Sequence, residues 1–116
     1  MIIDFHTHIF PDKIAAKTIE LLSKKGGIPP FSDGTVDGLV SKMENAGTDI
    51  SVTLPVLTNP SQFDSVNGFA KEINSAFVGK KKRLISFAGI HPYCDEIGKK
   101  MAYIKANGFL GIKIHP

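Results

Sequence analysis

Four short apolar runs, each separated from the next by a segment of helical periodicity, most constrain the fold of this 116-residue chain. The runs cover residues 1–8, 48–54, 84–90 and 109–114. The helical segments cover about 11–26, 35–47, 64–80 and 95–106. Alternation of this kind is typical of βα units, in which helices cover a parallel sheet. The pattern therefore predicts an α/β fold with about four parallel strands.

Local signals place the ends of the first two helices. Pro11 suits the first turn of a helix, and Gly26-Gly27 stops it. Thr35 is a residue type that caps helix N-termini, and Gly47 is one that ends helices. These signals predict helix boundaries close to the four positions.

The first strand ends in two histidines one residue apart, His6 and His8. Side chains alternate along a strand, so both imidazoles point to the same side and Thr7 to the other. Two neutral imidazoles on a rigid strand form half of a catalytic metal site. Asp4 shares their face, where it can orient an imidazole or lie in a polar layer. The alternative is a pair of solvent-exposed histidines that bind nothing.

Two further strands also deliver a histidine at or just beyond their carboxyl ends, His91 and His115. In parallel α/β folds the carboxyl ends of the strands form the edge where ligands bind. Along the last strand, Lys113 and His115 share one face while Ile112 and Ile114 share the other. We therefore expect His91, Lys113 and His115 to help position a substrate, or His91 to cap its own loop.

Composition sets limits on the partners. Hydrophobic residues make up 42% of the chain and charged residues 22%, as in ordinary globular domains. The net charge of +3 is mild, and the basic run 80–83 fits a solvated helix end. No apolar run approaches the roughly 20 residues needed to cross a membrane. We expect a cytoplasmic protein with a small-molecule substrate and neither nucleic acid nor membrane as partner.

Three motifs together carry a resemblance to a known family. They are I-I-D-F-H-T-H-I-F-P at residues 2–11, G-I-H-P at 89–92 and G-I-K-I-H-P at 111–116. In this order, at strand ends, they resemble the amidohydrolase superfamily, in particular its amidohydrolase-2 branch. The resemblance implies a (β/α)₈ TIM barrel and a metal-dependent hydrolase or non-oxidative decarboxylase. It also implies that His6 and His8 bind a divalent metal ion, zinc in the first place, with manganese, iron or nickel as alternatives.

The resemblance leaves the role of Lys113 open. Binuclear members of the superfamily carry a carboxylated lysine on the fourth strand, whereas the amidohydrolase-2 branch is usually mononuclear. An inward-facing lysine needs a carboxylate or an anionic ligand as partner. A salt-bridged or substrate-facing Lys113 is therefore favoured over a carbamate.

The family pattern also requires ligands that these residues do not contain. It places another histidine on a later strand and an aspartate on the last, and a complete barrel takes about 250 residues. We therefore expect residues 1–116 to be one domain, the N-terminal half of such a barrel, with little or no activity alone. The alternative is a non-catalytic half-barrel that forms a homodimer to cover its open sheet and acts as a binding or structural module.

Overall fold

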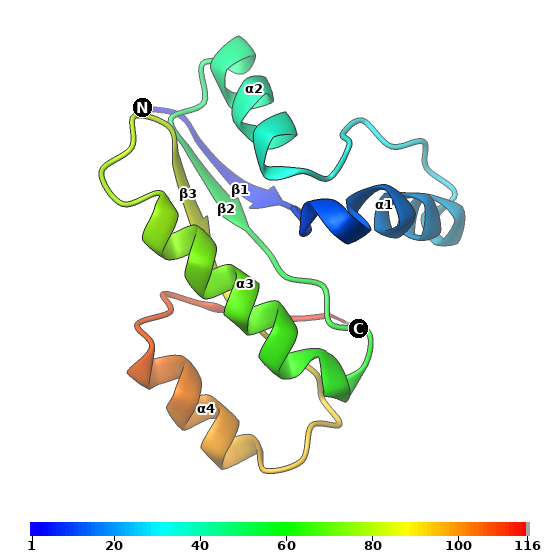
Figure 1. Cartoon of the computed structure of the whole chain (residues 1–116), viewed down its shortest axis with the longest axis vertical. Helices are drawn as coiled ribbons and strands as arrows, with labels where there is room; N and C mark the ends of the chain where they lie inside the picture. Colours follow the sequence, from blue (N-terminus) through cyan, green and yellow to red (C-terminus); the bar gives the residue numbers. More distant parts are fainter. Residues whose placement is uncertain (116) are drawn as a thin grey trace.

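The computed structural model describes residues 1–115 and has an α/β fold in which strands and helices alternate (Figure 1). Its elements are, in order, β1 (Ile3–Thr7), α1 (Asp12–Gly26), α2 (Val36–Ala46), β2 (Ile50–Thr53), the short 3-10 helix η1 (Pro60–Gln62), α3 (Phe63–Ala76), β3 (Arg83–Ser86), β4 (Ala88–Ile90), α4 (Ile97–Ala106) and β5 (Ile112–Ile114). All paired strands are parallel. The α/β class predicted from the sequence is confirmed, and the sheet formed by the described residues is not closed into a barrel.

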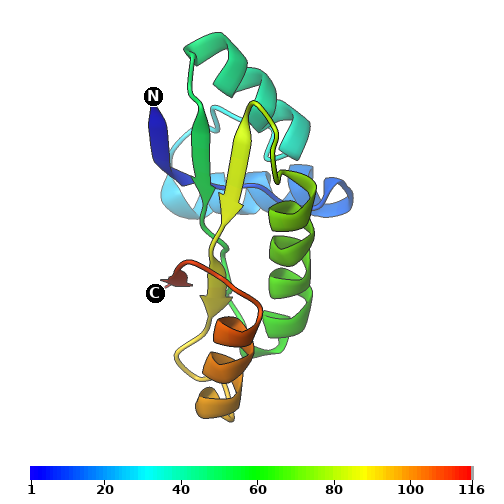
Figure 2. The ribbon, with the colours of Figure 1, turned by 90° about the vertical axis from the view of Figure 1, so that its left-hand side faces the viewer.

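The third predicted strand, residues 84–90, is broken into two at Phe87. β3 pairs with β2 in the sheet β1-β2-β3, whereas β4 pairs with β5 in a second sheet. The backbone N–H of Phe87 donates to the Thr53 carbonyl, and that of Ala88 donates to the Gly111 carbonyl. The run therefore changes its strand partner at Phe87, and β4 continues beyond β3 in Figure 2. The prediction of four strands is corrected to five short strands within residues 1–115.

Two asparagines of α3 satisfy backbone groups on either side of this break. The Asn74 amide donates to the Ser86 carbonyl and accepts from the Ser86 N–H, at 3.0 and 2.7 Å. Asn67 makes the same pair of bonds with Gly89, at 2.9 and 2.8 Å. Buried backbone groups need hydrogen-bond partners, and here side-chain amides supply them. Helix α3 thus joins the two sheets.

Both predicted ends of α2 are confirmed, whereas the predicted carboxyl end of α3 is wrong. The Thr35 hydroxyl accepts the Gly38 N–H, and Gly47 adopts the left-handed conformation after the helix. Helix α3 ends at Ala76 instead of reaching Lys80, because Phe77 closes it and Gly79 turns the chain with φ of 71°. The basic run 80–83 consequently follows a turn. No helix within residues 1–115 is long and apolar enough to span a membrane.

Two apolar clusters lie between the sheets and the helices. The first contains Ile9, Met43, Ile73 and Leu84, and α2 and α3 cover it. The second joins Phe63 of α3 and Ile104 of α4 to Leu57, Ala88, Ile90 and Cys94. In Figure 2, α2 and α3 lie on the same side of the strands. Helices α2 and α3 thus cover one side of the strands.

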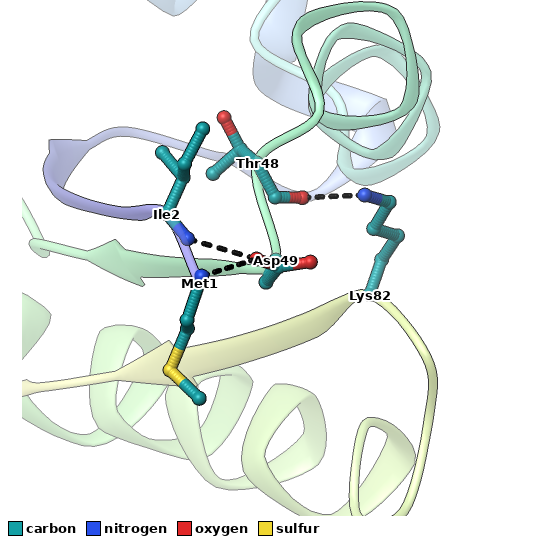
Figure 3. A network of polar contacts seen from close by, with 5 residues as sticks. All are labelled: Met1, Ile2, Thr48, Asp49 and Lys82. Atoms are coloured by element: carbon teal, nitrogen blue, oxygen red, sulfur yellow. Dashed lines mark hydrogen bonds and ion pairs between the residues drawn. The ribbon is translucent and has the colours of Figure 1, made fainter.

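The amino end of the sheet is held by a polar network (Figure 3). The Asp49 carboxylate accepts the Ile2 N–H at 2.8 Å and lies 4.0 Å from the Met1 ammonium. The hydrogen bond from Ile2 is the main cause that lowers the pKa of Asp49. Lys82 donates to the Thr48 carbonyl at 2.7 Å, so one lysine of the basic run has a structural contact. This network sets where β1 and β2 begin to pair.

Candidate metal centre

The rings of His6 and His8 lie side by side at the carboxyl end of β1. Their Nε2 atoms are 3.2 Å apart, and the ring planes are inclined by 75°. Between them, Thr7 is buried, and its hydroxyl donates to the Val52 carbonyl of β2 at 2.9 Å. This bond fixes the strand where the two histidines leave it. The convergence expected from strand alternation is therefore present.

A backbone carbonyl fixes the protonation of His8. The Nδ1 atom lies 2.7 Å from the Leu54 carbonyl, which can only accept, so Nδ1 carries the proton. Nε2 then presents its lone pair toward His6. Burial is the main cause that lowers the pKa of His8, and the charges of His6, Lys113 and His115 lower it further, against the Leu54 hydrogen bond. His8 is therefore neutral at neutral pH, the form that ligates metal ions.

The separation of the two nitrogens fits a shared metal ion. With Zn–N distances of about 2.0–2.1 Å and a tetrahedral angle, two imidazole nitrogens on one zinc ion stand about 3.3 Å apart. The observed 3.2 Å lies close to this value. In the structure this contact is a hydrogen bond, in which His6 Nε2–H donates to His8 Nε2, because the Nδ1 proton leaves His8 Nε2 as the acceptor. Metal binding needs His6 to carry its proton on Nδ1 instead.

Within residues 1–115, no cluster of three or more histidine, cysteine, aspartate or glutamate side chains is placed to hold a metal ion. Asp4 does not bond an imidazole. Its carboxylate accepts the backbone N–H of His6 at 3.1 Å, where the pairing register of β1 shifts. Asp4 therefore supports the strand backbone, and the described residues supply two ligands.

The last strand brings two of the predicted residues toward His8. Lys113 and His115 both lie close enough for their charges to lower the pKa of His8. Lys113 is half-buried, and no carboxylate of residues 1–115 forms an ion pair with it. A salt-bridged Lys113 is thus not observed there, and a substrate-facing role stays a prediction. Pro116, which ends the third motif, lies outside the described residues.

The isoleucines of the last strand point toward the helix side without being covered. Ile112 and Ile114 are in register with Ala88 and Ile90, whose side chains pack under the helices. Residues in register share a face of the sheet. Ile114 is nevertheless 58% exposed. The side chains of Ile112 and Ile114 therefore point to the predicted face, but the helices do not bury Ile114.

His91 takes part in its own loop. Its Nδ1 accepts the backbone N–H of Tyr93 at 3.2 Å, and its carbonyl accepts the N–H of Cys94 at 3.0 Å. The charges that lower the pKa of His8 do not include His91. These contacts favour the loop-capping interpretation, and its role toward a substrate stays a prediction.

Sequence reasoning missed a cavity of about 680 Å³ between α1 and α3. We call it the α1–α3 cavity. Its walls include Ile14, Leu21 and Leu22 of α1 and Val66 and Phe69 of α3. The sequence does contain a signal for it, the apolar stripe of α1. In the structure the core does not bury this stripe, since Ile14 is 49% and Leu21 is 56% exposed.

No family model, curated protein or solved structure matches this chain. The family resemblance therefore depends on the three motifs. What the geometry defines is an imidazole pair at the carboxyl end of a parallel strand, with a lysine and a third histidine nearby.

Proposed function

We propose that this chain belongs to a metal-dependent hydrolase of the amidohydrolase type. His6 and His8 hold a divalent ion, zinc in the first place, and the substrate is a small carbonyl or carboxylate compound. The observation that carries the proposal is the 3.2 Å separation of the two Nε2 atoms, with His8 held in the ligating tautomer. The parallel strand order also agrees with the first four strand positions of a (β/α)₈ barrel.

Each residue of the site has a distinct task in this proposal. A divalent ion bound there would supply Lewis-acid polarisation of a carbonyl oxygen or a water molecule. Leu54 keeps His8 oriented through its carbonyl. Lys113 and His115 hold an anionic or carbonyl group of the substrate, since both lie on the His8 side of the last strand. His91 shapes the neighbouring loop.

The described residues do not complete such a site. Structural and catalytic zinc sites have three or four protein ligands, whereas residues 1–115 provide two. Further ligands, and a base for the attacking water, must come from outside them. We therefore propose weak metal binding and little or no catalysis for the chain by itself.

Non-oxidative decarboxylation is the second candidate reaction. The feature in its favour is the lysine and histidine charge near His8, combined with the absence, among residues 1–115, of a carboxylate bonded to either imidazole. Loss of carbon dioxide from a bound carboxylate needs cationic groups to hold the substrate. It does not need a base to activate water.

Titration with Co²⁺, followed by its visible absorption, tests the metal proposal. We expect one ion per chain with weak affinity, and an affinity at least about tenfold lower in both H6A and H8A, since each removes one of two ligands. H91A is the matched control and should bind like the unchanged chain. Adding benzoate to the Co²⁺-loaded chain should change the spectrum, because open coordination positions accept a carboxylate.

Three results would contradict the proposal. They are the same affinity in H6A and H8A as in the unchanged chain, an equal loss in H91A, or a spectrum that benzoate leaves unaltered. Tight stoichiometric zinc binding by a monomer would contradict the two-ligand site.

A further inference from the structure

The α1–α3 cavity has apolar walls and basic groups at its border. Its volume of about 680 Å³ falls within the range of about 300–1,000 Å³ typical of small-molecule sites. Three of its lining residues, Lys24, Lys25 and His115, carry basic side chains, and no aspartate or glutamate lines it among residues 1–115. The charge around the cavity is therefore complementary to an anion.

The inner wall of the cavity contains a hydroxyl without a partner. Thr53 lines the cavity, is only 2% exposed, and its Oγ1 forms no hydrogen bond with any group of residues 1–115. Ser86, its register partner on β3, also lines the cavity, but its hydroxyl already donates to the Phe87 carbonyl at 3.3 Å. A buried hydroxyl without a partner is costly. An oxygen of a bound molecule would relieve that cost at Thr53.

The unpaired Thr53 hydroxyl and the basic side chains of Lys24 and Lys25 lie on different elements, β2 and α1. Helix α1 lines the cavity from Ile14 to Lys25, about 16 Å at 1.5 Å per residue. Lys24 and Lys25 belong to its last turn, and Lys24 already pairs with Glu20 at 2.7 Å. Lys25 forms no ion pair with residues 1–115, so it is the cation available to a ligand.

We propose that the α1–α3 cavity binds a medium-chain carboxylic acid of the fatty-acid type. The carboxylate pairs with Lys25, and the apolar chain lies between α1 and α3. An oxygen atom at the far end of that chain, such as a hydroxyl, accepts a hydrogen bond from the Thr53 hydroxyl. Neither of the proposed metal ligands, His6 and His8, lines the cavity, although Leu54 and His115, which the metal proposal also uses, do. The cavity binds its ligand in the absence of any metal ion.

Calorimetric titration in the presence of EDTA, below the micellar concentration, tests the proposal. Decanoate should bind saturably with one molecule per chain, and decyltrimethylammonium should bind at least about tenfold more weakly. 10-Hydroxydecanoate should bind more tightly than decanoate, and T53V should remove that difference, since valine keeps the shape and lacks the hydroxyl.

Charge and volume variants locate the site. K25E should weaken decanoate about tenfold, whereas K17E, with the same charge change on a part of α1 that does not line the cavity, should not. S65F should abolish binding by filling the cavity from the exposed side of α3. Far-UV circular dichroism verifies that each variant is folded.

Several outcomes would overturn this site. Among them are the lack of saturable decanoate binding, equal affinity for the cationic probe, and equal losses in K25E and K17E. H6A separates the two proposals: it should bind decanoate normally while it loses Co²⁺. If H6A bound Co²⁺ normally, the metal proposal would fail and the cavity proposal would stand.

Discussion

At the scale of single residues, one backbone carbonyl decides which nitrogen of His8 is available. The Leu54 carbonyl accepts a hydrogen bond from Nδ1–H of His8, so Nε2 faces His6 with its lone pair. Leu54 follows β2 directly, and its own N–H donates to the Thr7 carbonyl at 2.8 Å. The tautomer of the candidate ligand is thus set by the pairing of two neighbouring strands.

The lowered pKa of His8 predicts how the metal-free chain responds to acid. Because the folded-state pKa lies below the ordinary value of 6.5, the unfolded chain binds a proton that the folded chain does not. Stability should therefore be unaffected by His8 above pH 6.5 and should fall as the pH drops from there toward the folded pKa. NMR titration in EDTA should give His8 a midpoint below 6.5.

H8A provides the comparison for this titration. It lacks the titrating group, so its urea stability should decline less between pH 7 and pH 5 than that of the unchanged chain. A His8 midpoint at or above 6.5 would show that the Leu54 hydrogen bond outweighs burial.

At the scale of elements, α3 stabilises the broken strand through its amides, and Asn67 should be the more costly one to remove. Asn67 is fully buried, and its loss leaves the N–H and carbonyl of Gly89 without partners. Each unpaired buried group costs about 1–3 kcal/mol, so N67A should lower the free energy of unfolding by about 3 kcal/mol. N74A, at a half-buried position, should cost about 1 kcal/mol.

Urea denaturation of three variants measures these costs. N45A, at an exposed position of α2, is the matched control and should change stability by no more than about 0.5 kcal/mol. Equal effects of N67A and N45A would mean that the Asn67 amide does not stabilise the strand break.

The same elements show what the sequence can and cannot predict. Thr35 and Gly47 act at the ends of α2 itself, so the sequence around this helix is enough to predict where it begins and ends. The pairing of His6 with His8 also follows from local alternation along one strand. The break at Phe87 depends on partners that are distant in sequence, and no local pattern encodes it. The α1–α3 cavity likewise joins four separate stretches of chain.

At the scale of the whole molecule, apolar side chains remain uncovered at β1 and β5, two of the four strands that have one open edge among residues 1–115. β1 and β5 each pair with one strand only among residues 1–115. Phe5 on β1 is 63% exposed, and Ile114 on β5 is 58% exposed. Strand edges that carry apolar side chains pair readily with another chain. Two copies can satisfy both edges at once, with β1 of each copy beside β5 of its partner, under two-fold symmetry.

We therefore predict that the chain forms a homodimer through these edges. Sedimentation velocity should show a dimer that dissociates on dilution, and I114K should shift the equilibrium toward monomer because it places a charge at the β5 edge. V78K is the matched control, since Val78 is an exposed apolar residue in the turn after α3 and belongs to neither strand. A chain that stays folded and monomeric at all concentrations, or V78K and I114K acting alike, would exclude edge pairing.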